Sequence, residues 1–145
     1  MDVIVREVNV EDAPRIAELS SQLGYARSVP ATSRTIESII RHPDEIIRVA
    51  VHQQMVVGWI HVFYATRVES SPFCEIGGIV IDDHYRHKGI GKLLVASIKP
   101  WCMTKGTSML RVRCNIKRNE AHQFYLTLGF EEVKQQTVFE INMER

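Results

Sequence analysis

A basic turn with two glycines stands between an apolar run and a helical pattern. The run ends at Ile81, the turn follows, and apolar residues at helical spacing begin at Ile90. Glycine lets the backbone approach a ligand closely, and the free N–H groups and dipole of a helix N-terminus attract an anion. The sequence therefore predicts a pyrophosphate site formed by Arg86, His87, Lys88, Gly89, Ile90, Gly91 and Lys92.

The charge of the chain is divided in a way that fits such a site. Between His84 and Arg118 there are nine Lys and Arg residues and no acid, whereas the rest of the chain holds nine Lys and Arg and all seventeen acids. The basic segment suits a compact polyanion, while the acidic remainder would attract a cation and repel a long nucleic acid. We therefore expect no nucleic-acid partner.

Length and composition limit the class of protein. The 145 residues, of which 45% are hydrophobic, predict one domain over residues 1–145. No apolar stretch approaches the roughly 20 residues of a membrane span, and no signal segment opens the chain, so we expect a cytoplasmic protein without a membrane partner. Three cysteines without C-x-x-C spacing, and no H-E-x-x-H pattern, predict neither disulfides nor a metal site.

The elements that position the turn are predicted in the order βααβββαβαββ, an α/β fold with a mixed, mostly antiparallel sheet flanked by helices. A proline inside a helix loses one N–H and clashes with the preceding turn, so Pro100 predicts a kink or break between Ile98 and Trp101. Strands are expected at 3–8, 46–52, 55–65, 73–82, 108–114, 130–134 and 136–142, and helices at about 12–23, 32–42, 89–104 and 119–128.

Two motifs resemble those of one enzyme superfamily. The common nucleotide fingerprints do not fit, but Arg86-His87-Lys88-Gly89-Ile90-Gly91 resembles the R-x-x-G-x-G acyl-CoA loop of the general N-acetyltransferase (GNAT) superfamily. The segment from Ala121 to Phe130 resembles the superfamily's A-x-x-F-Y-x-x-x-G-F pattern. Because the element order also agrees over the whole chain, the two motifs together are specific.

The resemblance implies a co-substrate and a reaction. Acetyl-CoA would bind with its pyrophosphate on the turn and its pantetheine arm along Ile79, Val80 and Ile81, beside a bulge at Gly77-Gly78 and a slot between diverging strands. The acetyl group would pass by direct attack in a ternary complex to a primary amine of a small molecule, such as a polyamine or an aminoglycoside-like sugar. An acetyltransferase of protein or peptide amines and a non-catalytic acyl-CoA sensor are the alternatives, and a homodimer is compatible with the family.

Acetyl transfer needs a neutral amine and a stabilised leaving thiolate. An alkylamine of pKa about 10.4 is neutral in only about one molecule in 2,500 at pH 7, so a proton acceptor matters. Glu75, expected on the same strand face as Gly77 and Ile79, is the first candidate; His61 and water are the others. Tyr125 matches the family's proton donor, and we expect it chiefly to hydrogen-bond the sulfur, since a phenol is a weaker acid than a thiol.

The acceptor is expected against the first two helices, around residues 23–27 with Tyr25, beside His61 and the loop at 65–72. The chain departs from the family pattern at two places. Arg113 stands where some relatives carry an acidic base, and Arg118 stands where an asparagine is usual. We expect Arg118, with Asn115, to reach CoA.

Overall fold

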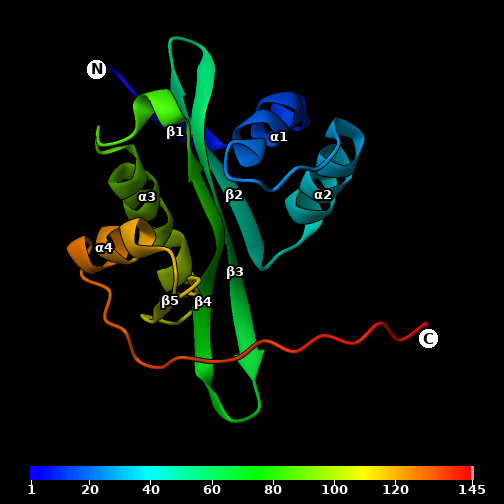
Figure 1. The fold of residues 1–145 in the computed structure, drawn as a ribbon, viewed down its shortest axis with the longest axis vertical. Helices are drawn as coiled ribbons and strands as arrows, with labels where there is room; N and C mark the ends of the chain where they lie inside the picture. Colours follow the sequence, from blue (N-terminus) through cyan, green and yellow to red (C-terminus); the bar gives the residue numbers. More distant parts are fainter. Residues whose placement is uncertain (145) are drawn as a thin grey trace. The chain divides into compact units, whose positions relative to one another are not determined.

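The computed structural model describes residues 1–144, and the chain divides into two compact units, Met1–Arg113 and Cys114–Arg145. In the first unit a five-stranded sheet follows the chain order (Figure 1). Neighbouring strands are antiparallel except for the parallel pair β4–β5, which confirms the predicted mixed sheet. The strands are β1 (Ile4–Glu7), β2 (Glu45–His52), β3 (Met55–Arg67), β4 (Ser70–Ile81) and β5 (Leu110–Val112).

The hairpin between β2 and β3 turns at Gln53 and Gln54, which lie between the strands predicted at 46–52 and 55–65. Their φ angles are 50° and 66°, and positive values at both positions are what a two-residue type I′ turn requires. This turn fixes the register that brings Ile47 opposite His61.

Helices cover both faces of the sheet. Figure 1 shows α1 (Ala13–Ser21) and α2 (Val29–Arg41) on one side and α3 (Ile90–Thr104) on the other. Apolar residues of α1, α2, β2 and β3 form one buried cluster. On the opposite face α3 packs closely, because a side chain at Gly58 would come within 3.3 Å of Leu94. We call these the α1/α2 face and the α3 face.

Helix α2 starts three residues earlier than predicted, and its buried apolar stripe is narrower than its sequence predicts. The Ser28 side chain accepts a hydrogen bond from the Ala31 amide, and the proline after Val29 lies in the first turn, where its missing N–H costs nothing. The helical spacing of Ile36, Ile39 and Ile40 predicts that all three are buried. Ile36 and Ile39 are buried, but Ile40 is 51% exposed because it lies off the sheet-facing stripe.

Helix α3 is continuous through Pro100, so the predicted break is absent. Pro100 and Ala96, the residue whose carbonyl loses its helical partner, are both exposed. Water can therefore satisfy that carbonyl, and the buried residues Leu94 and Ile98 hold the two halves of the helix against the sheet.

The second unit contains α4 (Asn119–Thr127). Asn115 shapes its approach, because Oδ1 accepts from the Lys117 amide at 2.9 Å. The strands predicted at 130–134 and 136–142 are not formed within the described residues. A strand needs a hydrogen-bonded neighbour as well as alternating apolar residues, and here Val138 and Phe139 are more than 80% exposed.

Candidate active site

The turn after β4 carries free backbone donors. Within residues 1–144 the amides of residues 87–92 donate to no backbone carbonyl, and the helical ladder begins with the Leu93 amide on the Gly89 carbonyl at 3.0 Å. His87 and Gly89 have φ angles of 61° and 82°, so the chain curls and its N–H groups converge in the manner of an anion-binding nest. This geometry suits the predicted pyrophosphate.

A buried carboxylate fixes the start of this turn. Asp82 is 4% exposed, accepts from the His84 amide at 3.0 Å and forms an ion pair with Arg15 of α1. Arg15 also donates to the Val56 carbonyl at 2.7 Å. Burial alone would raise the pKa of Asp82, but the hydrogen bonds from His84 and Arg15 outweigh it and lower that pKa below its usual value. Helix α1 therefore holds the turn in place.

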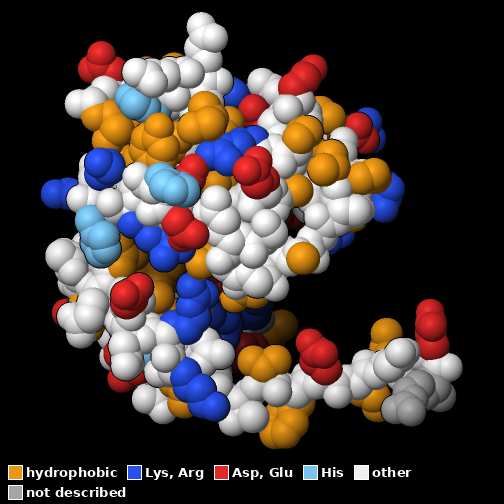
Figure 2. Space-filling view, turned by 45° about the horizontal axis from the view of Figure 1, so that its top comes forward, with side chains coloured by type: hydrophobic (Ala, Val, Ile, Leu, Met, Phe, Trp, Pro, Cys, Tyr) orange, Lys and Arg blue, Asp and Glu red, His pale blue; other side chains and the backbone are white. Residues whose placement is uncertain are grey.

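Basic side chains surround the turn. Arg86 pairs with Asp83 at 2.8 Å, whereas Lys88 and Lys92 are exposed. In Figure 2 histidine and basic side chains lie on the left of the visible face, where Figure 1 places the η2 turn (Asp83–Tyr85) and the start of α3.

Strand β4 contains a β-bulge at Gly77. His61 pairs with Gly78 and Val62 pairs with Ile76, so Gly77 is an extra residue, a bulge. The parallel pairing with β5 also stops at Ile76 and Val112. Beyond that point, among the described residues, β4 pairs with β3 alone, which leaves an open main-chain edge along 77–81, shortly before the turn at 87–92.

The bulge changes which residues share a face, and it makes the predicted placement of Glu75 wrong. Cross-strand partners in an antiparallel pair share a face, so the register puts Glu75 with Gly78 and Val80, not with Ile79. Glu75 is 7% exposed, and Arg113 donates from Nε to both of its carboxylate oxygens at 3.2 and 3.3 Å. A carboxylate held in this way is poorly placed to take a proton from a substrate.

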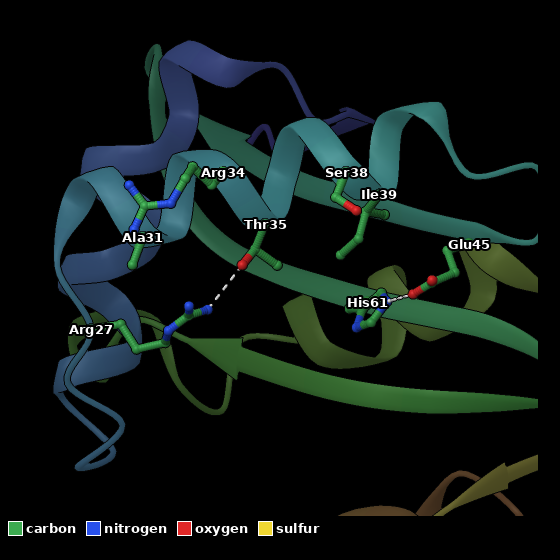
Figure 3. Close-up of a pocket in the computed structure, with 8 residues that line it drawn as sticks. All are labelled: Arg27, Ala31, Arg34, Thr35, Ser38, Ile39, Glu45 and His61. Atoms are coloured by element: carbon green, nitrogen blue, oxygen red, sulfur yellow. Dashed lines mark hydrogen bonds and ion pairs between the residues drawn. The ribbon is translucent and has the colours of Figure 1, made fainter. Parts of the chain in front are cut away.

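His61 lies on the α1/α2 face against the bulge. A side chain at Gly77 would come within 2.7 Å of its Nδ1, and its Nε2 lies 2.7 Å from Glu45 Oε1. Both residues line a cavity of about 440 Å³, and Figure 3 shows them at one end of it. The carboxylate can only accept, so Nε2 carries the proton and Nδ1 is left as an acceptor.

The two predicted tyrosines differ in environment. Tyr25 is 59% exposed on the loop between α1 and α2, so it does not cover the core. Tyr125 is half-buried in α4, where Phe124 and Phe130 contact its ring edge-on at centroid distances of 5.2 and 5.6 Å. Burial, together with Cys114, raises the pKa of Tyr125 to about 12.

The structure brings together most of the residues that the sequence singled out in the first unit. The turn follows the open edge of β4 in the chain, and His61 lies on the neighbouring strand β3, opposite Gly78. Glu45 and Arg34 also line the cavity, although the sequence alone did not indicate either of them as a site residue. Glu45 could have been found from the hairpin register, since it lies two residues before Ile47, the partner of His61.

Comparison with known proteins defines the class. Residues 13–130 match the family described as Acetyltransferase (GNAT) family. Over 136 residues the chain is 26% identical to an uncharacterized N-acetyltransferase of Chlorobaculum tepidum, covering 93% of this chain and 79% of that protein. The chain therefore belongs to the GNAT family of acetyl-CoA-dependent N-acetyltransferases.

Two solved structures of other proteins share the fold of this chain. An aminoglycoside 6'-N-acetyltransferase from Acinetobacter baumannii superposes with a TM-score of 0.87 at 16% identity, covering 98% of this chain and 99% of that one. An aminoglycoside N-acetyltransferase solved in complex with CoA gives 0.86 at 19% identity, covering 97% and 95%. Within residues 1–144, none of the helices has the length and apolar character needed to cross a membrane.

Proposed function

We propose that residues 1–145 act as one N-acetyltransferase domain that moves an acetyl group from acetyl-CoA to the primary amine of a small molecule, by direct attack in a ternary complex. One observation carries the proposal. The turn with free amides at 87–92 follows the open edge of β4 at 77–81 after the short η2 turn, so a diphosphate and an extended arm can bind along one segment.

Acetyl-CoA would be held mainly by main-chain groups. The amides of His87, Lys88, Gly89, Ile90, Gly91 and Lys92 would bind the diphosphate, with the Arg86, Lys88 and Lys92 side chains adding positive charge. The main chain of Ile79, Val80 and Ile81 would pair with the pantetheine arm as an additional strand does. Asn115 and Arg118, in the second unit, are the further CoA contacts that we propose.

The proton of the amine would pass to His61. Its Nδ1 accepts no hydrogen bond within residues 1–144 and faces the bulge, while Glu45 holds the ring through Nε2. A carboxylate that orients a histidine and stabilises its charged form is a recurrent arrangement for general bases. His61 therefore replaces Glu75, which Arg113 engages, as the group proposed to accept the proton.

Tyr125 would act on the leaving group by hydrogen bonding. With its pKa raised to about 12, full transfer of its proton to a thiolate of ordinary pKa about 8.5 is uphill by about 5 kcal/mol. A charge-assisted hydrogen bond to the sulfur needs no such transfer.

Bonds and protons balance in the proposed acetyl transfer. The lone pair of the neutral amine forms the new C–N bond at the thioester carbon, and the C–S bond breaks with its electron pair on sulfur. The amine loses one proton to His61 Nδ1, and the thiolate, hydrogen-bonded by Tyr125, gains one proton from solvent. The products are the acetamide and CoA.

The acceptor named by the sequence is a small amine, such as a polyamine or an aminoglycoside-like sugar. The names of the two solved structures above support a small-molecule acceptor.

Calorimetry with acetyl-CoA and thiol release across an amine panel test the proposal. We expect saturable acetyl-CoA binding, amine-dependent thiol release, and a fall in kcat of about 10- to 100-fold in Tyr125→Phe, the effect of losing one hydrogen bond to a charged group. Tyr85→Phe, at the edge of the turn, is the control for loss of a phenol. Binding without release for any amine would indicate an acyl-CoA sensor, and no binding would overturn the proposal.

A further inference from the structure

The cavity that contains His61 is lined mainly by one face of α2. Its wall combines two arginines, two hydroxyls, a carboxylate and an imidazole with the apolar side chains of Ala31 and Ile39. Such a wall is suited to a polar molecule with more than one charged group. The lining residues are Arg27, Ala31, Arg34, Thr35, Ser38, Ile39, Glu45 and His61.

One end of the cavity is cationic. Figure 3 shows the guanidinium groups of Arg27 and Arg34 at the end where Ala31 lies. Arg27 Nη1 donates to Thr35 Oγ1 at 3.0 Å. Within the described residues neither arginine forms an ion pair, whereas Arg15, on the neighbouring helix, pairs with Asp82. Each guanidinium has five N–H donors in a planar fork that matches a carboxylate or phosphate.

The other end is where the proposed chemistry occurs. His61 and Glu45 lie there, hydrogen-bonded to each other and adjacent to the bulge in β4. Glu45 is also 3.8 Å from His42, so its charge has partners on two sides. A molecule that places its amine beside His61 would extend its remaining part toward Arg27 and Arg34.

We propose that the acceptor is an amine that also carries an oxyanion, a carboxylate or a phosphate, and that Arg27 and Arg34 bind this group. The inference rests on the proposed function, which it narrows. Polyamines and aminoglycoside-like sugars are disfavoured, because their additional positive charges would face the two arginines.

Transfer to matched acceptors tests the inference. β-Alanine, aminoethylphosphonate and propylamine share an amine and a chain length and differ in the terminal group; lysine and cadaverine form a second pair that differs by one carboxylate. For at least one pair we expect kcat/KM to be about 10- to 100-fold higher for the anionic member, the usual strength of hydrogen bonds to a charged group. The carboxylate and phosphonate arms distinguish the two oxyanions.

Variants assign the preference to the cavity. Arg34→Gln and Arg27→Gln should bring the anionic-to-neutral ratio of kcat/KM close to one by raising KM for the anionic amine. Arg41→Gln is the matched control, because Arg41 is an exposed arginine of the same helix that does not line the cavity. Equal rates for both members of every pair, or an equal effect of Arg41→Gln, would overturn the inference.

A binding measurement separates this inference from the proposed function. Protein saturated with CoA, so that the 87–92 turn is filled, is titrated with acetate or inorganic phosphate while the arginine Nε–H signals are followed by NMR. We expect the signals of Arg27 and Arg34 to shift and that of Arg41 to stay unchanged. No shift at Arg27 and Arg34 refutes the anion site, whether or not the protein transfers acetyl groups; no transfer to any amine counts against the proposed function.

Discussion

The two halves of the proposed reaction are served by regions built in different ways. The turn proposed to bind the pyrophosphate is one continuous segment, and its free amides at 87–92 would form the binding surface. The acceptor cavity is assembled from side chains of the α1–α2 loop, α2, β2 and β3. The first depends on the backbone path and the second on particular side chains. Substitutions should therefore affect the two regions separately. A change of side chain should impair the cavity, whereas a change of backbone preference should impair the turn.

The largest effect is expected in the cavity. His61→Ala should lower kcat by about 10²- to 10⁴-fold, the usual contribution of a general base, while acetyl-CoA affinity measured by calorimetry stays unchanged. Added imidazole should restore part of the rate, because the truncated side chain leaves room for it.

Glu75→Gln is the control for that experiment. It keeps the side-chain shape and removes the charge that pairs with Arg113, so stability should fall. Because this carboxylate is engaged by Arg113, kcat should change by less than about threefold. A loss in Glu75→Gln as large as that in His61→Ala would instead make Glu75 the base.

An intermediate effect is expected in the turn. Gly89 has a φ of 82° and open space around its Cβ position, so Gly89→Ala acts through backbone preference, at about 1–2 kcal/mol. Acetyl-CoA affinity should fall about 10-fold as the turn relaxes, a change of about 1.4 kcal/mol in binding.

Gly106→Ala is matched to it, because Gly106 has a φ of 85° and equally open surroundings at the end of α3. Both variants should lose similar stability in urea unfolding, and only Gly89→Ala should lose affinity. Equal affinities would mean that the path of the turn does not matter for binding.

The smallest effect on activity is expected at the support of the turn, where stability changes instead. Asp82 is buried and paired with Arg15, so Asp82→Asn should lower the free energy of unfolding by about 3 kcal/mol at pH 7. Because folding lowers the pKa of Asp82, its contribution is present above the unfolded pKa of about 3.9 and is lost as the pH falls through the folded value.

Urea unfolding at a series of pH values measures this. The gap between wild type and Asp82→Asn should narrow in acid, whereas Asp83→Asn, which removes an exposed pair with Arg86, should cost less than about 1 kcal/mol at any pH. A gap that stays constant down to pH about 2, far below the carboxyl pKa range, would contradict the assigned role of the Asp82 charge.

The contrast between the two regions also explains what could be predicted from the sequence. The turn was predictable because glycines, basic residues and a helix start are contiguous, and so was the hairpin at Gln53-Gln54, whose conformation is local. Glu45 and Arg34 were not assigned, because their roles depend on the register of β2 on β3 and on the face that α2 presents to the cavity.

Two errors have the same physical origin. Counting alternate residues places Glu75 on the face of Ile79, but the bulge at Gly77 shifts that count by one. The strands at 130–134 and 136–142 were assigned from alternation, yet a strand also needs a neighbour to pair with. The local sequence pattern gives the structural preference of a segment, and the strand that it pairs with decides which structure forms.

The bulge has a consequence for insertions and deletions in the gene. Deleting codon 77 would restore regular alternation and turn residues 70–76 over, so that Glu75 would point toward the α3 face and Ile76 toward the cavity side. A loss of three nucleotides there would thus exchange charged and apolar surfaces along half a strand, so selection should tolerate very few changes of length at this position.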